Sequence, residues 1–234
     1  MAGLCENALM SGMQWMKGIV HVGANVGQEV ADYARFKDVP VLLVEPLEEL
    51  IPQIQAEIAA QKPGDYRIAQ TCCSDQDDQI VDFHVSLDPK AQASSMLKPG
   101  SVVQTYPWLS ETRQVQVKTT TLDTLLTRDH PDFPINMLAI DAQGAELIVL
   151  RGAAKTLQRC DAVYVEVSDQ PMYEGGCTFK QIHDFLDRRG FALFRSVLTT
   201  AGWGNAFFMR REPTYADDLS AIAARNIAQG KPVT

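Results

Sequence analysis

Short apolar runs alternate with longer amphipathic stretches along most of the chain. A run that is apolar at every position is typical of a parallel strand covered on both faces, whereas apolar residues spaced three and four apart indicate a helix. The pattern predicts strands at residues 19–22, 41–45, 66–73, 137–141, 160–167, 191–197 and 205–209. It predicts helices at residues 28–36, 47–61, 142–157 and 178–189. Strands that alternate with helices in this way indicate an α/β fold with a mostly parallel sheet.

Other segments depart from this alternation. Residues 80–86 alternate apolar and polar positions, which predicts a half-exposed strand, while residues 88–114 are irregular and contain several prolines. A connection of that length usually has a function of its own, so we expect a substrate loop or lid there. A β-rich stretch at 115–120 and a short helix at 122–126 follow it. We expect residues 1–17 to be a helical cover, 215–229 a last helix, and 1–234 a single domain.

Composition and charge narrow the possible classes of function. The 234 residues are 46% hydrophobic and 21% charged, the range of ordinary globular proteins, and the net charge is −8. An acidic balance disfavours a nucleic-acid partner, because phosphate backbones are bound by clustered Lys and Arg. The five cysteines have no disulfide or zinc spacing, and we expect no secretory leader or membrane span, hence a cytoplasmic location. A homo-oligomer remains possible.

A glycine-punctuated turn follows the first predicted strand. Gly23, Asn25 and Gly27 form a G-x-N-x-G pattern, in which glycine lets the backbone approach a ligand closely. The dinucleotide pattern G-x-G-x-x-G and the P-loop are both absent, which argues against an NAD-dependent oxidoreductase. Glu45 ends the second strand about twenty residues later, where a carboxylate can accept hydrogen bonds from both hydroxyls of a ribose.

The predicted carboxyl ends of the strands gather polar side chains at one edge of the sheet, where ligands of such folds bind. They are His21, Glu45, Ser74, Asp141, Glu166 and Asp169. Four acids without a basic residue suit a cationic, hydroxyl-rich cofactor such as S-adenosylmethionine better than a pyrophosphate. Ser74 and Asp75 could bond the exocyclic amine of its base or could form a simple turn.

Several segments, in order and at matching spacing, resemble the FkbM-type methyltransferases: HVGANVGQ (21–28), VEP (44–46), VKTTTLDTLL (117–126), IDAQGAELIVLRGA (140–153) and VEV (165–167). The resemblance implies a class I, Rossmann-like methyltransferase fold: a mostly parallel seven-stranded sheet with helices on both faces and an antiparallel last strand. It also implies O-methylation of a sugar, polyketide or other natural-product hydroxyl with S-adenosylmethionine. In this sequence His21 stands where the family usually has aspartate.

The residues and the resemblance together give a set of expected site residues. The candidate catalytic residues are Asp141, Glu146 and His21. The candidate cofactor-binding residues are His21, Gly23, Asn25, Gly27, Glu45, Ser74, Asp75, Asp141 and Gln143. Asp141 is the first choice of base, although an ordinary aspartate is too acidic unless burial or nearby acids raise its pKa.

Three alternatives stay open at this point. Glu146 could simply place favourable charge at a helix N-terminus. Asp141, Glu166 and Asp169 could hold Mg²⁺, although we expect no metal. The substitution at His21 would also fit a catalytically silent protein with a cofactor-binding or regulatory role. The methyl acceptor itself is not given by the sequence, and residues 88–114 are expected to shape its pocket.

Overall fold

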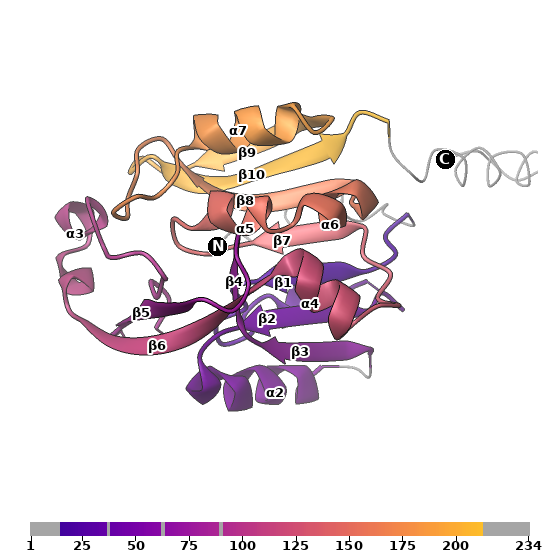
Figure 1. Cartoon of the computed structure of the whole chain (residues 1–234), viewed down its shortest axis with the longest axis horizontal. Helices are drawn as coiled ribbons and strands as arrows, with labels where there is room; N and C mark the ends of the chain where they lie inside the picture. The colour runs from indigo at the N-terminus through magenta and orange to yellow at the C-terminus, as the bar shows by residue number, and fades with distance from the viewer. Residues whose placement is uncertain (1–14, 37, 62–63, 89–90, 213–234) are drawn as a thin grey trace, which may run out of the picture.

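A seven-stranded sheet forms the centre of the protein (Figure 1). The computed structural model describes residues 15–36, 38–61, 64–88 and 91–212. The predicted helix at 215–229 and most of the predicted cover at 1–17 lie outside these residues. The strands of this sheet, in spatial order, are β3 (Tyr66–Gln70), β2 (Val41–Glu45), β1 (Ile19–Val22), β7 (Met137–Ile140), β8 (Ala162–Ser168), β10 (Trp203–Arg210) and β9 (Phe191–Leu198).

The strand directions confirm the predicted fold class. The neighbours from β3 through β8 pair in parallel, and β10 pairs antiparallel with both β8 and β9. Strand β1 lies between β2 and β7, with Val20 opposite Leu42 on one side and Leu138 on the other. The connections therefore reverse direction at β1, which opens a crevice at the carboxyl ends of these strands.

Helices cover both faces of the sheet, because every central strand is apolar on both sides. One face packs against α4 (Leu122–Arg128), α5 (Glu146–Arg151), α6 (Ala154–Arg159) and α7 (Phe179–Asp187). The other face packs against α1 (Val30–Tyr33) and α2 (Ile51–Ala59), the latter preceded by the 3-10 turn η3 (Glu48–Leu50). The helix α7 begins with a capping box made by Thr178 and Gln181.

Three predicted elements differ from the observed ones. The strand predicted at 66–73 divides at Thr71, because β4 (Cys72–Ser74) leaves the main sheet and pairs with β6 (Thr112–Thr121). The helix predicted at 142–157 breaks at Gly152, where a Cβ would lie 2.0 Å from the backbone oxygen of Ser74. The helix predicted at 28–36 is only the single turn α1.

A second, three-stranded sheet carries the irregular segment. It has the order β4-β6-β5, with β5 (Ile80–Ser86) antiparallel to β6. Residues 88–114 contain α3 (Val102–Thr105), the 3-10 turn η4 (Pro107–Ser110) and the start of β6. The segment also bonds to the loop after β8: Gly100 and Val102 donate to the backbone oxygen of Met172. We call residues 91–111 the lid segment.

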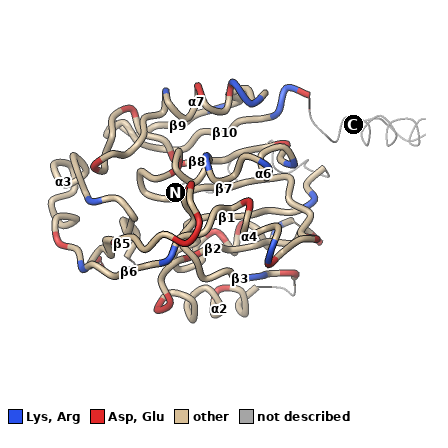
Figure 2. Tube along the Cα trace, viewed as in Figure 1, with Lys and Arg blue, Asp and Glu red and all other residues tan. Residues whose placement is uncertain are grey.

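Basic residues are spread over the described part of the chain. In Figure 2, Lys and Arg positions are spread over several elements of the described chain, among them α7, β3 and the lid segment. None of the described helices is long and apolar enough to cross a membrane. The cytoplasmic location, the absence of a nucleic-acid partner and the oligomeric state stay predictions.

Candidate active site

The turn after β1 brings two strand ends into contact. Gly23 adopts a φ of +84°, and a Cβ placed on it would lie 1.8 Å from the backbone oxygen of Asp141. Only glycine tolerates both the conformation and the approach. The absence of a side chain at Gly23 therefore brings the end of β1 against the first residue after β7.

Glu45 ties the end of β2 to the same turn. Its Oε2 accepts the backbone N–H of Asn25 at 2.8 Å, and its Oε1 accepts the N–H of Leu47 at 3.0 Å. Asn25 has a φ of +48°, a conformation that asparagine tolerates better than most residues. Burial raises the pKa of Glu45 to about 7, although both N–H groups favour the ionised form.

A first cavity, which we call the turn-side cavity, lies above these strand ends. Its lining includes Gly23 and the polar residues Asn25, Glu45 and Asp141, and its apolar lining includes Val22, Val44, Cys72, Cys73, Phe83, Met96 and Val149. None of the described residues lining it is Lys or Arg. A buried carboxylate, an apolar slot and a second acid are chemically suited to a diol, a flat base and a cationic group, which are the parts of S-adenosylmethionine.

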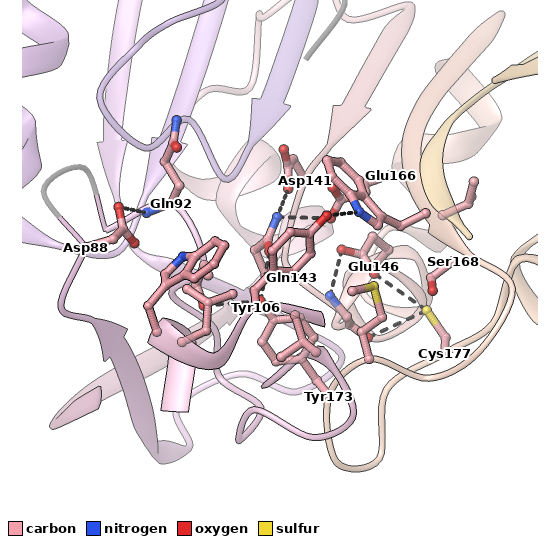
Figure 3. A pocket seen from close by; sticks show the side chains of 18 of the residues that line it. Asp88, Gln92, Tyr106, Asp141, Gln143, Glu146, Glu166, Ser168, Tyr173 and Cys177 are labelled. Carbon is pink, nitrogen blue, oxygen red and sulfur yellow. Dashed lines mark hydrogen bonds between the residues drawn. The ribbon is translucent and has the colours of Figure 1, made fainter. Parts of the chain in front are cut away.

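A second cavity adjoins the first, and we call it the aromatic cavity (Figure 3). It measures about 310 Å³, and Tyr106, Trp108, Tyr173 and Trp203 are among its lining residues. The Trp203 Nε1–H donates to the Tyr106 hydroxyl at 2.9 Å, and the rings of Tyr106 and Trp108 meet edge to face at 5.3 Å. The lid segment and the strand β10 therefore build one wall together.

Asp141 and Gln143 line both cavities, as do Gln28 and Gln92. The Nε2 of Gln143 donates to Asp141 Oδ1 at 2.6 Å and to Glu166 Oε2 at 2.9 Å. Its Oε1 accepts the Tyr173 hydroxyl at 2.8 Å. Figure 3 shows Gln143 between the two acids, so the border between the cavities is an ordered hydrogen-bond network.

Burial perturbs both acids of this network. It raises the pKa of Asp141, and the hydrogen bond from Gln143 opposes that rise. Burial and then the charge of Asp141 raise the pKa of Glu166 well above its ordinary range. When two carboxyl groups lie this close, they do not both ionise readily, and their apparent pKa values belong to the pair.

Glu146 holds the loop that precedes its own helix. Its Oε1 accepts the backbone N–H groups of Ala142 and Gly144, both at 3.0 Å. Its Oε2 lies 3.6 Å from the sulfur of Cys177. The carboxylate lines the aromatic cavity, but its hydrogen bonds support a loop-holding role better than a catalytic one.

His21 lies beneath the site and lines neither cavity. Its side chain is buried, and its Nδ1 lies 3.1 Å from the hydroxyl of Tyr33. Burial lowers the pKa of His21 to about 4, against the opposing charge of Asp141. The imidazole is therefore neutral near pH 7 and does not repel a cationic ligand, which supports a structural role.

The comparison with protein families bears on this arrangement directly. The profile described as "Methyltransferase FkbM domain" matches residues 21–193, which include the turn, Glu45 and the Asp141 loop. The chain belongs to the FkbM methyltransferase family. The family resemblance predicted from the sequence is thus confirmed.

Individual relatives are more distant. The 2-O-methyltransferase NoeI of Sinorhizobium fredii is 31% identical over 125 residues, 51% of each chain. The match thus spans about half the length of that curated relative. Among solved structures, a methyltransferase from Aquifex aeolicus has a TM-score of 0.44 at 10% identity, covering 86% of this chain and 87% of that one. For M. capricolum TrmK with S-adenosyl-homocysteine, the TM-score is 0.47 at 5% identity, covering 92% and 80%.

Four of the expected cofactor residues of this FkbM-family chain line neither cavity: His21, as described above, and Gly27, Ser74 and Asp75. Gly27 packs against α2, where a Cβ would lie 3.3 Å from the Cα of Ile54. Ser74 and Asp75 do not line the turn-side cavity; Thr71, Cys72 and Cys73 do. The chain turns toward the second sheet at Thr71, which carries Ser74 past the cavity to Gly152.

Other lining residues were missed by the sequence analysis. Tyr173 follows β8 in a loop, and Gln92 lies in the lid segment. Neither lies directly at a strand end or matches a motif, so no local signal marked them. Tyr106 and Trp108 belong to residues 88–114, which were expected to shape the acceptor pocket, and both line the aromatic cavity.

Three acids could also be considered for a metal. Asp141, Glu146 and Glu166 each offer an oxygen, and these atoms lie within 4.8 Å of one another. The set differs from the one considered from sequence, because Asp169 bonds to Gly202 through its backbone and lines neither cavity. Gln143 donates to two of the three acids, and its amide occupies positions that a cation would need.

Proposed function

We propose that this protein is an S-adenosylmethionine-dependent O-methyltransferase that acts on a hydroxyl of a small molecule, such as a sugar, a polyketide or another natural product. The observation that carries the proposal is the shared border of the two cavities. Asp141 and Gln143 line both of them, so a cofactor on one side and an acceptor on the other would meet at these side chains.

The turn-side cavity would hold the cofactor. Glu45 would accept from the ribose hydroxyls, because each carboxylate oxygen can accept more than the one backbone bond it has. The apolar residues around Cys72 and Phe83 would cover the base. When bound, S-adenosylmethionine supplies a methyl group on a sulfonium, and transfer to a hydroxyl releases that hydroxyl's proton.

The aromatic cavity would hold the acceptor. Trp108 and Tyr106 offer flat apolar faces, and Asp141 offers an acceptor for a hydroxyl proton. Bringing the acceptor oxygen into line and excluding water is the main task of such an enzyme. The name of the curated relative, a 2-O-methyltransferase, supports a hydroxyl as the acceptor here.

Asp141 would be the general base. It follows β7 directly and lies at the border of the cavities, within reach of a hydroxyl in the aromatic cavity. Burial raises its pKa, which makes it a better proton acceptor than an ordinary aspartate. Glu146 is bound to backbone N–H groups, and His21 lies outside the cavities, so both are weaker candidates.

The alternative of a catalytically silent protein depended on His21. Because that imidazole is buried, neutral and bonded to Tyr33, its presence gives no reason to expect a broken cofactor site. We therefore propose no second function.

Calorimetric titration with S-adenosylmethionine and S-adenosylhomocysteine, with NAD as the control, tests the cofactor. A screen of hydroxylated small molecules for the mass gain of one methyl group tests the reaction. Micromolar binding of both sulfur compounds, no binding of NAD and a methylated product are expected. Absence of binding by S-adenosylhomocysteine would overturn the proposal.

A further inference from the structure

The amide of Gln143 makes one hydrogen bond to each of two acids. Its nitrogen has two hydrogens, and its Nε2 lies 2.6 Å from Asp141 Oδ1 and 2.9 Å from Glu166 Oε2. An oxygen of each carboxyl group lies within 4.8 Å of an oxygen of the other. Asp141 follows β7 and Glu166 lies in β8, so Gln143 connects the ends of adjacent strands.

Tyr173 fixes which way this amide points. Its hydroxyl lies 2.8 Å from Gln143 Oε1 and 3.2 Å from the backbone oxygen of Ala93. A flipped amide would place its oxygen against two carboxyl groups and its N–H against the Tyr173 hydroxyl. The hydroxyl therefore selects the orientation in which both N–H groups face the acids.

The backbone around Gln143 is held from the lid side as well. Gln143 has a φ of +51°, and its backbone oxygen accepts the Ser95 hydroxyl at 2.8 Å. A Cβ on Gly144 would lie 2.7 Å from the Tyr173 ring. Ser95 and Ala93 belong to the lid segment, so the position of that segment and the orientation of the amide are linked.

We infer that Gln143 and Tyr173 are positioning residues that hold Asp141 and Glu166 as one proton-sharing pair facing the acceptor. The catalytic role of the pair rests on the proposed function. The pair itself can be tested in the protein without any ligand. In the proposed reaction the acceptor O–H bond would break and its proton would move to an oxygen of Asp141. The electron pair left on the acceptor oxygen would form the bond to the methyl carbon as the bond from that carbon to the sulfonium sulfur breaks, and the electrons of the broken bond would stay on sulfur as a neutral thioether.

Several other titratable groups lie around this pair, and the experiment must allow for them. Those that interact with the pair itself come from β1, the residue before α1, the start of α5, β8 and the loop after β8: His21, Glu29, Glu146, Tyr164 and Tyr173. Two more interact with these neighbours, Asp88 with Tyr173 and Cys177 with Glu146. The test variants leave all of these unchanged except Tyr173 itself.

The test is a pH titration of the full chain with ¹³C in the aspartate carboxyl groups, followed by NMR without any ligand. The Asp141 signal is assigned by its loss in Asp141→Asn. In Gln143→Glu an oxygen replaces the NH₂ group, so the apparent pKa of Asp141 should rise by about one unit or more. Tyr173→Phe, which frees the amide to turn, should raise it by less, and Tyr66→Phe on the distant strand β3 should leave it unchanged.

The outcomes separate the inference from the proposed function. Thermal melts first establish that both variants are folded. The inference is overturned if the NMR titration curves of Asp141 in Gln143→Glu and Tyr173→Phe superimpose on the wild-type curve. An ordinary pKa of Asp141 in wild type would overturn it too. Failure to bind S-adenosylhomocysteine would instead count against the proposed function and leave the titration result standing.

Discussion

The backbone N–H of Asn25 donates a 2.8 Å hydrogen bond to Oε2 of Glu45, so the turn after β1 and the end of β2 are held together. The same carboxylate is the proposed ribose ligand. Glu45→Gln keeps the size of the side chain but removes its charge and one acceptor oxygen. A hydrogen bond to a charged group contributes about 1.5–3 kcal/mol, so affinity for S-adenosylhomocysteine should fall about tenfold or more.

Calorimetry measures this loss of affinity, with Glu57→Ala on the exposed side of α2 as the control. Equal affinity in Glu45→Gln and wild type would show that Glu45 does not contact the cofactor.

The contact between Gly23 and Asp141 predicts a large loss of stability on substitution. Gly23→Ala would force a Cβ to 1.8 Å from the Asp141 oxygen at a φ of +84°. Gly175 has a similar φ, +73°, but a Cβ placed on it would have no neighbouring heavy atom within 4 Å, so Gly175→Ala is the matched control. We expect a loss of more than about 3 kcal/mol for Gly23→Ala and about 1–2 kcal/mol for Gly175→Ala, measured by urea unfolding. Similar losses in both would mean that the turn relaxes away from Asp141.

The raised pKa of Glu45 predicts that the stability of the protein depends on pH. Burial raises its pKa in the folded state from 4.5 to about 7, so folding favours its neutral form. Below pH 4.5 Glu45 is protonated in both states, and its contribution to stability is fully present. Between pH 4.5 and 7 the carboxyl group ionises in the unfolded chain but stays protonated in the folded protein, so this contribution is lost as the pH rises through 7. The amide that replaces this carboxyl group in Glu45→Gln does not titrate.

The stability of this variant relative to wild type should therefore increase from pH 5 to pH 8, by up to about 3 kcal/mol. Chemical denaturation at the two pH values measures it. A constant difference would show that the folded Glu45 titrates normally.

Asp141→Asn tests the proposed base. The amide cannot take up the hydroxyl proton, so turnover of any acceptor found in the screen should fall by about 10²–10⁴-fold. Affinity for S-adenosylhomocysteine should stay nearly unchanged. Asp82→Asn on the exposed side of β5 is the matched control, and turnover of Asp141→Asn at the wild-type rate would remove Asp141 from the mechanism.

Trp108 tests the assignment of the two cavities. It lines the aromatic cavity and not the turn-side cavity, and it is 64% exposed. Trp108→Ala should raise the KM for the acceptor several-fold and leave kcat and S-adenosylhomocysteine affinity nearly unchanged. A loss of cofactor affinity instead would mean that the cavities are assigned the wrong way round.

Much of the fold could be predicted because buried parallel strands are apolar at every position. The runs that include Val20, Leu42 and Leu138 mark strands that pair side by side. The turn-side cavity was also predictable in part, since Gly23, Glu45 and Asp141 each lie at or just past a strand end. The family profile, which begins at residue 21 and includes all three, confirms the family resemblance, while the roles of these three residues stay predictions.

The features of the fold and site that could not be predicted depend on contacts between segments far apart in the sequence. Nothing near Thr71 indicates that β4 pairs with β6, because its partner lies almost fifty residues later in the chain. Tyr173 reaches Gln143 only once the loop after β8 has folded onto the lid segment. The neutral state of His21 comes from burial against Tyr33, which a strand pattern does not reveal.

The lid segment leaves and rejoins the protein between neighbouring positions of one hairpin, since Ser86 of β5 pairs with Thr112 of β6. A segment whose two ends are fixed side by side can change in length and sequence during evolution without altering the seven-stranded sheet. Insertions there would reshape one wall of the aromatic cavity while Gly23, Glu45 and Asp141 stay in place. If that cavity holds the acceptor as proposed, descendants of one core can diverge in substrate through a single exchangeable segment.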